Sequence, residues 1–139
     1  NAESRRVDDL VARLADSLDA LAPAGLRLAG AVVFPNVSEG RILATGVTGE
    51  GADLLPTLAV RARNAAVASG IEVDGQRFRA HLTVARTGGR HVEMTNWVRL
   101  LDTYEGPAWT LDSVAVIASH LGEGPHRTPR YETLAEIAW

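Results

Sequence analysis

The segment RFRAHLTVAR, Arg77 to Arg86, contains a histidine and a threonine two residues apart, with arginines close by. In a β-strand, residues two apart lie on the same face, so the segment predicts that Arg79, His81 and Thr83 point in one direction. Together they offer a cation, an imidazole that can accept or donate a proton, and a hydroxyl. These are the groups that could bind a phosphate and transfer a proton at it.

The opposite face of the same segment carries Phe78, Leu82 and Val84, and we expect these apolar side chains to pack on a core. On strict alternation Arg86 also points that way. It joins the histidine face only if the glycine pair that follows it, or a β-bulge, turns it. Spacing alone favours a simpler interpretation, in which the histidine is a partly buried core residue and the threonine a residue that favours strands.

Composition limits the classes of protein to consider. The 139 residues, 46% hydrophobic and 22% charged, are typical of one globular domain spanning 1–139. The net charge of -3 does not favour non-specific binding to nucleic acid through bulk charge. All 14 basic residues are arginine, and four of them lie between Gly75 and Val92 without an acid, which favours a local anion site. Cysteine is absent, so thiol chemistry is excluded, and no apolar run reaches membrane-spanning length.

The elements that would position these residues alternate between helix and strand. Apolar periodicity and turn residues predict, in order, helix 7–21, strands 26–34 and 41–47, helix 54–69, strand 78–86, helix 95–104 with Thr95 as N-cap, a β-rich run 109–119 and strand 130–139. Two hairpins within this order favour an α+β fold with largely antiparallel sheet.

Three stretches resemble one known family. FRAHLTVAR, the final RYETLAEIAW and the upstream GRILATGV resemble the C-terminal part of the 2H phosphoesterases, specifically the bacterial RNA 2′,3′-cyclic phosphodiesterases, also called 2′-5′ RNA ligases. The resemblance covers nearly the whole chain. It implies a two-lobed fold in which antiparallel sheets are flanked by helices and two histidine-x-threonine motifs face each other across a cleft.

The resemblance also implies an activity. The family hydrolyses the 2′,3′-cyclic phosphate of an RNA end to a 2′-phosphate without a metal or other cofactor. His81 would be the general base and Thr83 a donor to the phosphate oxygens. The expected substrate-binding residues are Arg79, Arg86, Arg130 and His126. The partners would then be RNA with a cyclic phosphate end or a cyclic nucleotide, in the cytoplasm and without membrane association.

One departure from the family pattern bears on activity. No histidine precedes His81, whereas the resemblance implies a first motif in the N-terminal lobe that supplies the acid. We therefore expect that an N-terminal part carrying it is missing from this sequence. A non-catalytic module that binds RNA ends or nucleotides is the main alternative, and 2′-5′ RNA ligation by reversal of the same chemistry is another.

Overall fold

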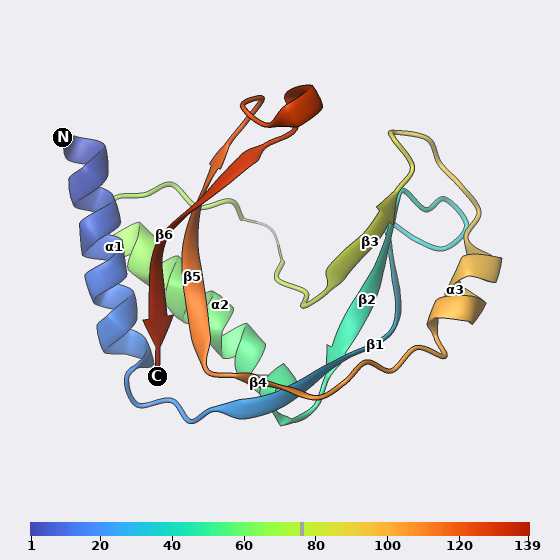
Figure 1. Ribbon diagram of the computed structural model, residues 1–139, viewed down its shortest axis with the longest axis horizontal. Helices are drawn as coiled ribbons and strands as arrows, with labels where there is room; N and C mark the ends of the chain where they lie inside the picture. Colours follow the sequence, from blue (N-terminus) through green and yellow to red (C-terminus); the bar gives the residue numbers. More distant parts are fainter. Residues whose placement is uncertain (76) are drawn as a thin grey trace. The chain divides into compact units, whose positions relative to one another are not determined.

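The computed structural model describes residues 1–75 and 77–139 (Figure 1). Its elements are α1 (Ala2–Leu18), β1 (Ala24–Phe34), β2 (Ile42–Thr48), α2 (Glu50–Ala68), β3 (Leu82–Arg86), α3 (Thr95–Leu101), β4 (Trp109–Leu111), β5 (Ser113–His120), the 3-10 turn η1 (Pro125–Arg127) and β6 (Arg130–Ala138). Every pairing between these strands is antiparallel. The α+β class and the antiparallel sheet predicted from the sequence are confirmed.

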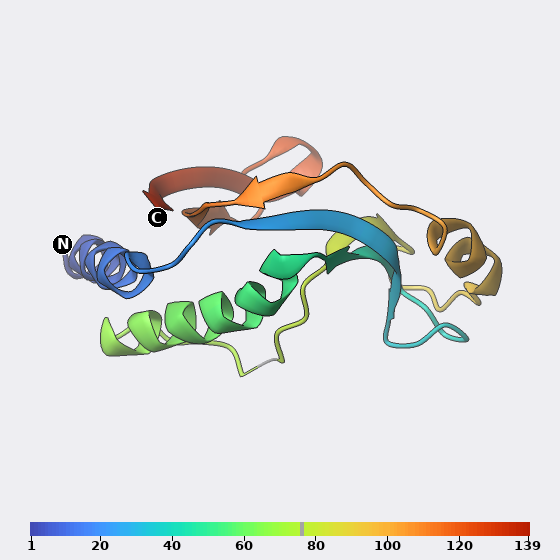
Figure 2. The same ribbon diagram turned by 90° about the horizontal axis from the view of Figure 1, so that it is seen from below.

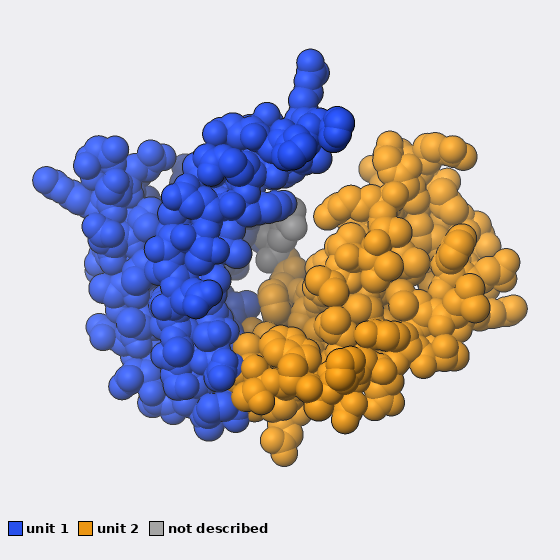
Figure 3. All heavy atoms as spheres, in the orientation of Figure 1, with its two compact units in different colours: residues 1–23, 58–75, 112–139 blue, residues 24–57, 76–111 orange. Residues whose placement is uncertain are grey.

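The chain divides into two compact units (Figure 3). Unit 1 comprises Asn1–Pro23, Leu58–Gly75 and Asp112–Trp139, and unit 2 comprises Ala24–Thr57 and Gln76–Leu111. The expectation of a single domain over residues 1–139 stays a prediction.

Unit 1 is built on an amphipathic helix and a hairpin. The Asn1 side chain accepts a hydrogen bond from the Ser4 N–H at 2.8 Å, so an N-cap starts α1 five residues before the predicted helix. Leu14 and Leu18 are buried on the face that periodicity predicts, and α1 packs against β6. In the hairpin, β5 and β6 pair from Ser113 opposite Ala138 to His120 opposite Arg130.

Unit 2 contains a four-stranded sheet in the order β3-β2-β1-β4, with α3 against β1. A register shift at Gly30 interrupts the pairing of β1 with β2, and β1 curves along its length (Figure 2). Gly30 has a φ of 71°, a conformation that favours glycine. Its carbonyl accepts from the Thr45 hydroxyl at 2.8 Å and its N–H donates to the Tyr104 carbonyl at 3.1 Å, so the bend is anchored on both sides.

The sequence predictions for the run 109–119 and for the cap of the third helix differ from the structure. The β-rich run 109–119 is two strands, because β4 pairs with β1 in unit 2 whereas β5 pairs with β6 in unit 1. Thr95 is the first helical residue of α3 rather than its N-cap, and Met94 holds the cap position without a side-chain hydrogen bond. No helix among the described residues combines the length and apolar character needed to cross a bilayer.

The prediction that the apolar face of the histidine segment packs on a core is wrong. Phe78, Leu82 and Val84 are 52%, 53% and 56% exposed. β3 begins only at Leu82 and lies at the edge of the sheet, with β2 as its neighbour among the described strands. An edge strand packs fewer of its side chains than a central one, and alternation cannot reveal which position a strand occupies.

Candidate functional site

His81 immediately precedes β3 and has one ring nitrogen held by the backbone. Its Nδ1 lies 2.6 Å from the carbonyl oxygen of Arg79. A carbonyl only accepts hydrogen bonds, so Nδ1 carries the proton of this contact. In the neutral ring the lone pair is therefore on Nε2. The side chain is exposed, and Nε2 is the nitrogen that can take a proton from a reactant.

An aromatic ring that sequence reasoning missed packs against this imidazole. The Phe34 and His81 ring centroids are 4.8 Å apart, with the planes inclined by 57°. The guanidinium carbon of Arg79 lies 5.7 Å from the centroid of the same phenyl ring. Phe34 is the last residue of β1, and no local pattern around position 81 indicates that a residue so distant in the chain would contact it.

A β-bulge in β3 determines which side chains share the face with Thr83. Thr83 pairs with Ala44 and Ala85 pairs with the preceding residue of β2, Leu43, so Val84 is an extra residue in β3 without a partner in the register. Strict alternation therefore does not extend through β3.

The register beyond the bulge brings Arg86 onto the face of Thr83. Arg86 pairs with Ile42, and Thr83 pairs with Ala44. Side chains of directly paired residues lie on the same face, and Ile42 and Ala44 share a face because they are two apart. Phe34 also pairs with Ile42, so the phenyl ring that touches His81 belongs to this face as well. The sequence allowed this placement of Arg86 only on the condition of a bulge, and the bulge is present.

No carboxylate of the described residues forms an ion pair with the arginines around this face. Among the described residues, the arginines that form ion pairs are Arg13, Arg27 and Arg130. Arg79 and Arg86 are not among them, and both side chains are exposed. We refer to Arg79, His81, Thr83 and Arg86 as the histidine face. It combines a proton acceptor, a hydroxyl and two guanidinium groups that can bind an anion.

The other face of the sheet has a different character. It carries an apolar groove of about 580 Å³ lined by Leu43, Val84, Trp97, Leu100, Leu101, Thr103, Tyr104 and Glu105. Leu43 alternates with the residues that pair with Thr83 and Arg86, so it belongs to the opposite face. The bulged Val84 contributes to this groove, and the histidine face does not.

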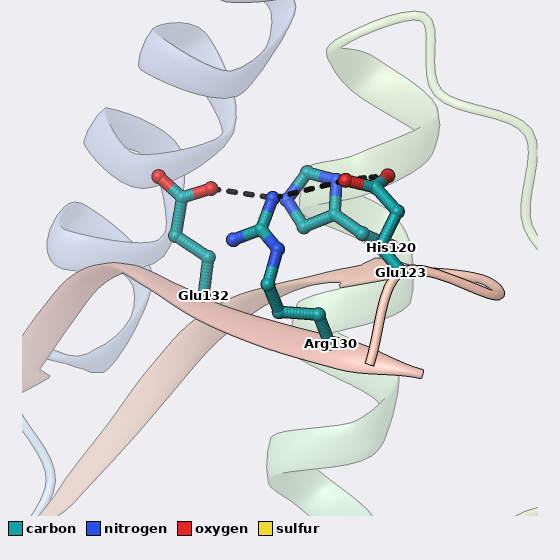
Figure 4. Close-up of polar contacts among 4 residues, drawn as sticks. All are labelled: His120, Glu123, Arg130 and Glu132. Atoms are coloured by element: carbon teal, nitrogen blue, oxygen red, sulfur yellow. Dashed lines mark hydrogen bonds and ion pairs between the residues drawn. The ribbon is translucent and has the colours of Figure 1, made fainter. Parts of the chain in front are cut away.

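Two expected substrate-binding residues lie in unit 1. Arg130 opens β6, and its Nη2 is 3.3 Å from Oε1 of Glu123 (Figure 4). His120 completes this group, with Nε2 at 3.0 Å from Glu132 Oε2 and Nδ1 at 3.5 Å from Glu123 Oε2. A phosphate would have to compete with Glu123 for the guanidinium of Arg130.

The other expected ligand, His126, lies in η1 with a φ of 55°. With Arg127 and Thr128 it forms a second histidine-x-threonine sequence, which sequence reasoning overlooked. It lies in a turn rather than a strand, and the Thr128 hydroxyl donates to the Pro125 carbonyl at 2.6 Å. Within residues 1–75 and 77–139, no group of three or more histidine, cysteine, aspartate or glutamate residues is placed to hold a metal ion.

Comparison with known proteins gives a likeness to a solved structure. No protein-family model and no curated protein matches the sequence. The chain is similar to the crystal structure of TT0787 from Thermus thermophilus, with 25% sequence identity and a TM-score of 0.64, over 96% of this chain and 69% of that one. The observed fold is consistent with the 2H phosphoesterase-like fold expected from the sequence, and the match supports a phosphoesterase-type function.

Proposed function

We propose that the chain is an RNA 2′,3′-cyclic phosphodiesterase that hydrolyses a cyclic phosphate at an RNA end, or a cyclic nucleotide, to the 2′-phosphate. The observation that supports this most strongly is the histidine face. It presents an imidazole nitrogen with a lone pair, a hydroxyl on the same face, and a guanidinium group that is in none of the ion pairs of the described residues. Hydrolysis of a phosphodiester without a metal can use the first as a base and the other two as donors to the phosphate oxygens.

In the proposed reaction, His81 Nε2 takes a proton from water while the water oxygen forms a bond to phosphorus. The bond from phosphorus to the 3′ oxygen breaks, and that oxygen takes a proton from a second group. The resemblance gives this second role to another histidine-x-threonine motif. The Thr83 hydroxyl and the Arg86 guanidinium would hold the non-bridging oxygens, whose negative charge increases as water attacks.

Turnover of a 2′,3′-cyclic nucleotide in the presence of EDTA tests this proposal. Replacing His81 with asparagine should lower kcat/KM about 100- to 10,000-fold, the usual contribution of a positioned acid or base. The matched control is His91→Asn in the same unit, because His91 contacts Arg41 and the Glu39 carbonyl outside the histidine face. Unchanged turnover in His81→Asn would show that His81 is not the base. Activity that depends on a metal would contradict the mechanism.

The expected role of His126 in substrate binding is tested in the same assay. Replacing His126 with asparagine should raise KM and leave kcat nearly unchanged if His126 only binds substrate, as the sequence predicts. A collapse of kcat instead would contradict a role in binding alone.

A binding module for RNA ends or nucleotides is the second candidate, because Arg79 and Arg86 are outside the ion pairs of the described residues and can bind an anion without any reaction. The histidine face would then bind a cyclic phosphate without cleaving it. Saturable binding of the cyclic nucleotide, weakened in Arg86→Gln and accompanied by no turnover, would favour this function over the enzyme.

A further inference from the structure

Three contacts join Phe34, Arg79 and His81 into one closed group. The phenyl ring of Phe34 packs on the imidazole at 4.8 Å between centroids, and the Arg79 guanidinium carbon lies 5.7 Å from the phenyl centroid. The third contact is the 2.6 Å hydrogen bond between His81 Nδ1 and the Arg79 carbonyl oxygen. Phe34 thus touches both the histidine and the residue that accepts the histidine's hydrogen bond.

The hydrogen bond and the ring contact restrain different motions of the imidazole. The bond to the Arg79 carbonyl holds Nδ1 but lets the ring turn about the line that joins the two atoms. A phenyl ring packed against the imidazole opposes that turning and fixes the direction of Nε2. The contact of the guanidinium with the phenyl ring restrains Arg79 as well. Losing Phe34 therefore loosens both partners of the hydrogen bond at once.

Phe34 is itself held by the sheet. It pairs with Ile42 at the end of β1, and its carbonyl accepts from the Arg41 N–H at 2.8 Å. His81, in contrast, lies just outside β3 and has no place in the strand register. Phe34 is therefore held more firmly than His81 and can orient the imidazole.

From this geometry we propose that Phe34 is a positioning residue for His81. Its ring keeps the imidazole in the Nδ1–H tautomer and directs Nε2 away from the Arg79 carbonyl toward the reactant. In this role Phe34 contacts neither the attacking water nor the phosphate and acts only through the histidine. The consequence for catalysis rests on the proposed function, whereas the effect on the tautomer of His81 does not.

The tautomer is tested by NMR, without any turnover. In protein labelled with ¹⁵N at histidine, the nitrogen shifts of His81 at a pH where the ring is neutral should report Nδ1–H as the main form. Replacing Phe34 with leucine should lower the share of that form, and Phe34→Tyr, which retains the ring, should keep it. Phe78→Leu, the same substitution at an exposed phenylalanine close in sequence, should also leave the His81 shifts unchanged.

Turnover of a 2′,3′-cyclic nucleotide gives the second measurement. Phe34→Leu should lower kcat by about 10- to 100-fold, because a small displacement of a catalytic group costs that much, and should leave KM within about twofold. Phe34→Tyr should restore kcat. Thermal unfolding curves of the three variants show whether each is folded at the assay temperature.

Two outcomes would overturn the inference. The first is a His81 spectrum in folded Phe34→Leu that matches the unchanged protein. The second is a rise in KM with unchanged kcat, which would make Phe34 a contact of the substrate instead. If the unchanged protein hydrolyses no cyclic nucleotide at all, the proposed function fails, while the NMR comparison still decides the role of Phe34.

Discussion

At the scale of single residues, His81 and Thr83 have different roles in the proposed reaction. The His81 imidazole accepts a proton, and the Thr83 hydroxyl donates a hydrogen bond to a phosphate oxygen. His81 presents Nε2 because its other nitrogen is bonded to a carbonyl, which cannot donate in return. Thr83 is half-buried and lies on the same sheet face as Arg86. Because a strand holds the hydroxyl in place, little free energy is needed to reorient it when charge develops on a phosphate oxygen.

Removal of the Thr83 hydroxyl should slow the chemical step and so lower kcat. Thr83→Val keeps the branched shape and takes away one donor, so kcat for a cyclic nucleotide should fall by roughly 100-fold, the usual loss for one such donor. Thr110→Val, the same change in the exposed part of β4, serves as the control. Equal kcat values for Thr83→Val and Thr110→Val would show that the Thr83 hydroxyl does not contact the reacting phosphate.

At the scale of elements, the bulge in β3 decides the composition of the site. A regular strand would place Thr83 and Arg86 on opposite faces, because they are an odd number of residues apart. Because Val84 has no partner in β2, the alternation of faces shifts by one residue after it. The Arg86 guanidinium therefore lies on the same face as the Thr83 hydroxyl. Bulges are common next to active sites for this reason.

The position of Arg86 can be tested through substrate affinity. Arg86→Gln should raise KM for a cyclic nucleotide about tenfold, which corresponds to one charge-assisted hydrogen bond. Arg90→Gln changes the net charge by the same amount just beyond the strand, and should leave KM within about twofold. If the two variants raise KM equally, the effect is one of general charge and Arg86 has no specific contact.

The start of α3 contains a contact that responds to pH. The Thr95 hydroxyl and then the Thr95 N–H donate to Glu93, and these bonds hold the pKa of the Glu93 carboxyl below its ordinary value of 4.5. A pKa that is lower in the folded state stabilises the fold above the ordinary value. That stabilisation is lost as the pH falls through the lowered pKa.

Thr95→Val should therefore raise the pKa of Glu93 toward 4.5, and NMR titration of the carboxyl carbon measures it. The variant should melt at a lower temperature than the unchanged protein at neutral pH, and the difference in Tm should close as the carboxyl becomes protonated. A difference in Tm that stays constant down to strongly acidic pH would show that the hydroxyl stabilises α3 in another way.

At the scale of the whole molecule, each compact unit contains a leucine whose side chain is almost fully buried. Leu18 in unit 1 is 1% exposed and Leu26 in unit 2 is 2% exposed. Burying such a side chain stabilises a fold by about 1.5 to 3 kcal/mol. The two leucines therefore report on the two units separately.

Unfolding in urea can test the prediction of a single domain. Leu18→Ala and Leu26→Ala should each lower the free energy of unfolding by about 2 to 5 kcal/mol. If the chain is one domain, both variants shift the same single transition. Leu121→Ala, at a position 80% exposed, should change it by less than about 0.5 kcal/mol. Two transitions, each shifted by only one of the buried variants, would refute a single cooperative domain.

Local pattern was enough to predict the helices and strands and the α+β class, and to single out His81 and Thr83 as candidates, because periodicity depends only on neighbours in the chain. Local pattern failed wherever a strand pairing or a side-chain contact involved a residue far away in the sequence. The run 109–119 contributes strands to two different sheets, Val84 forms a bulge against β2, and Phe34 at the end of β1 contacts His81. Strand pairing and ring contacts of this kind arise only when segments far apart in sequence pack together, and the orientation of the proposed base depends on them.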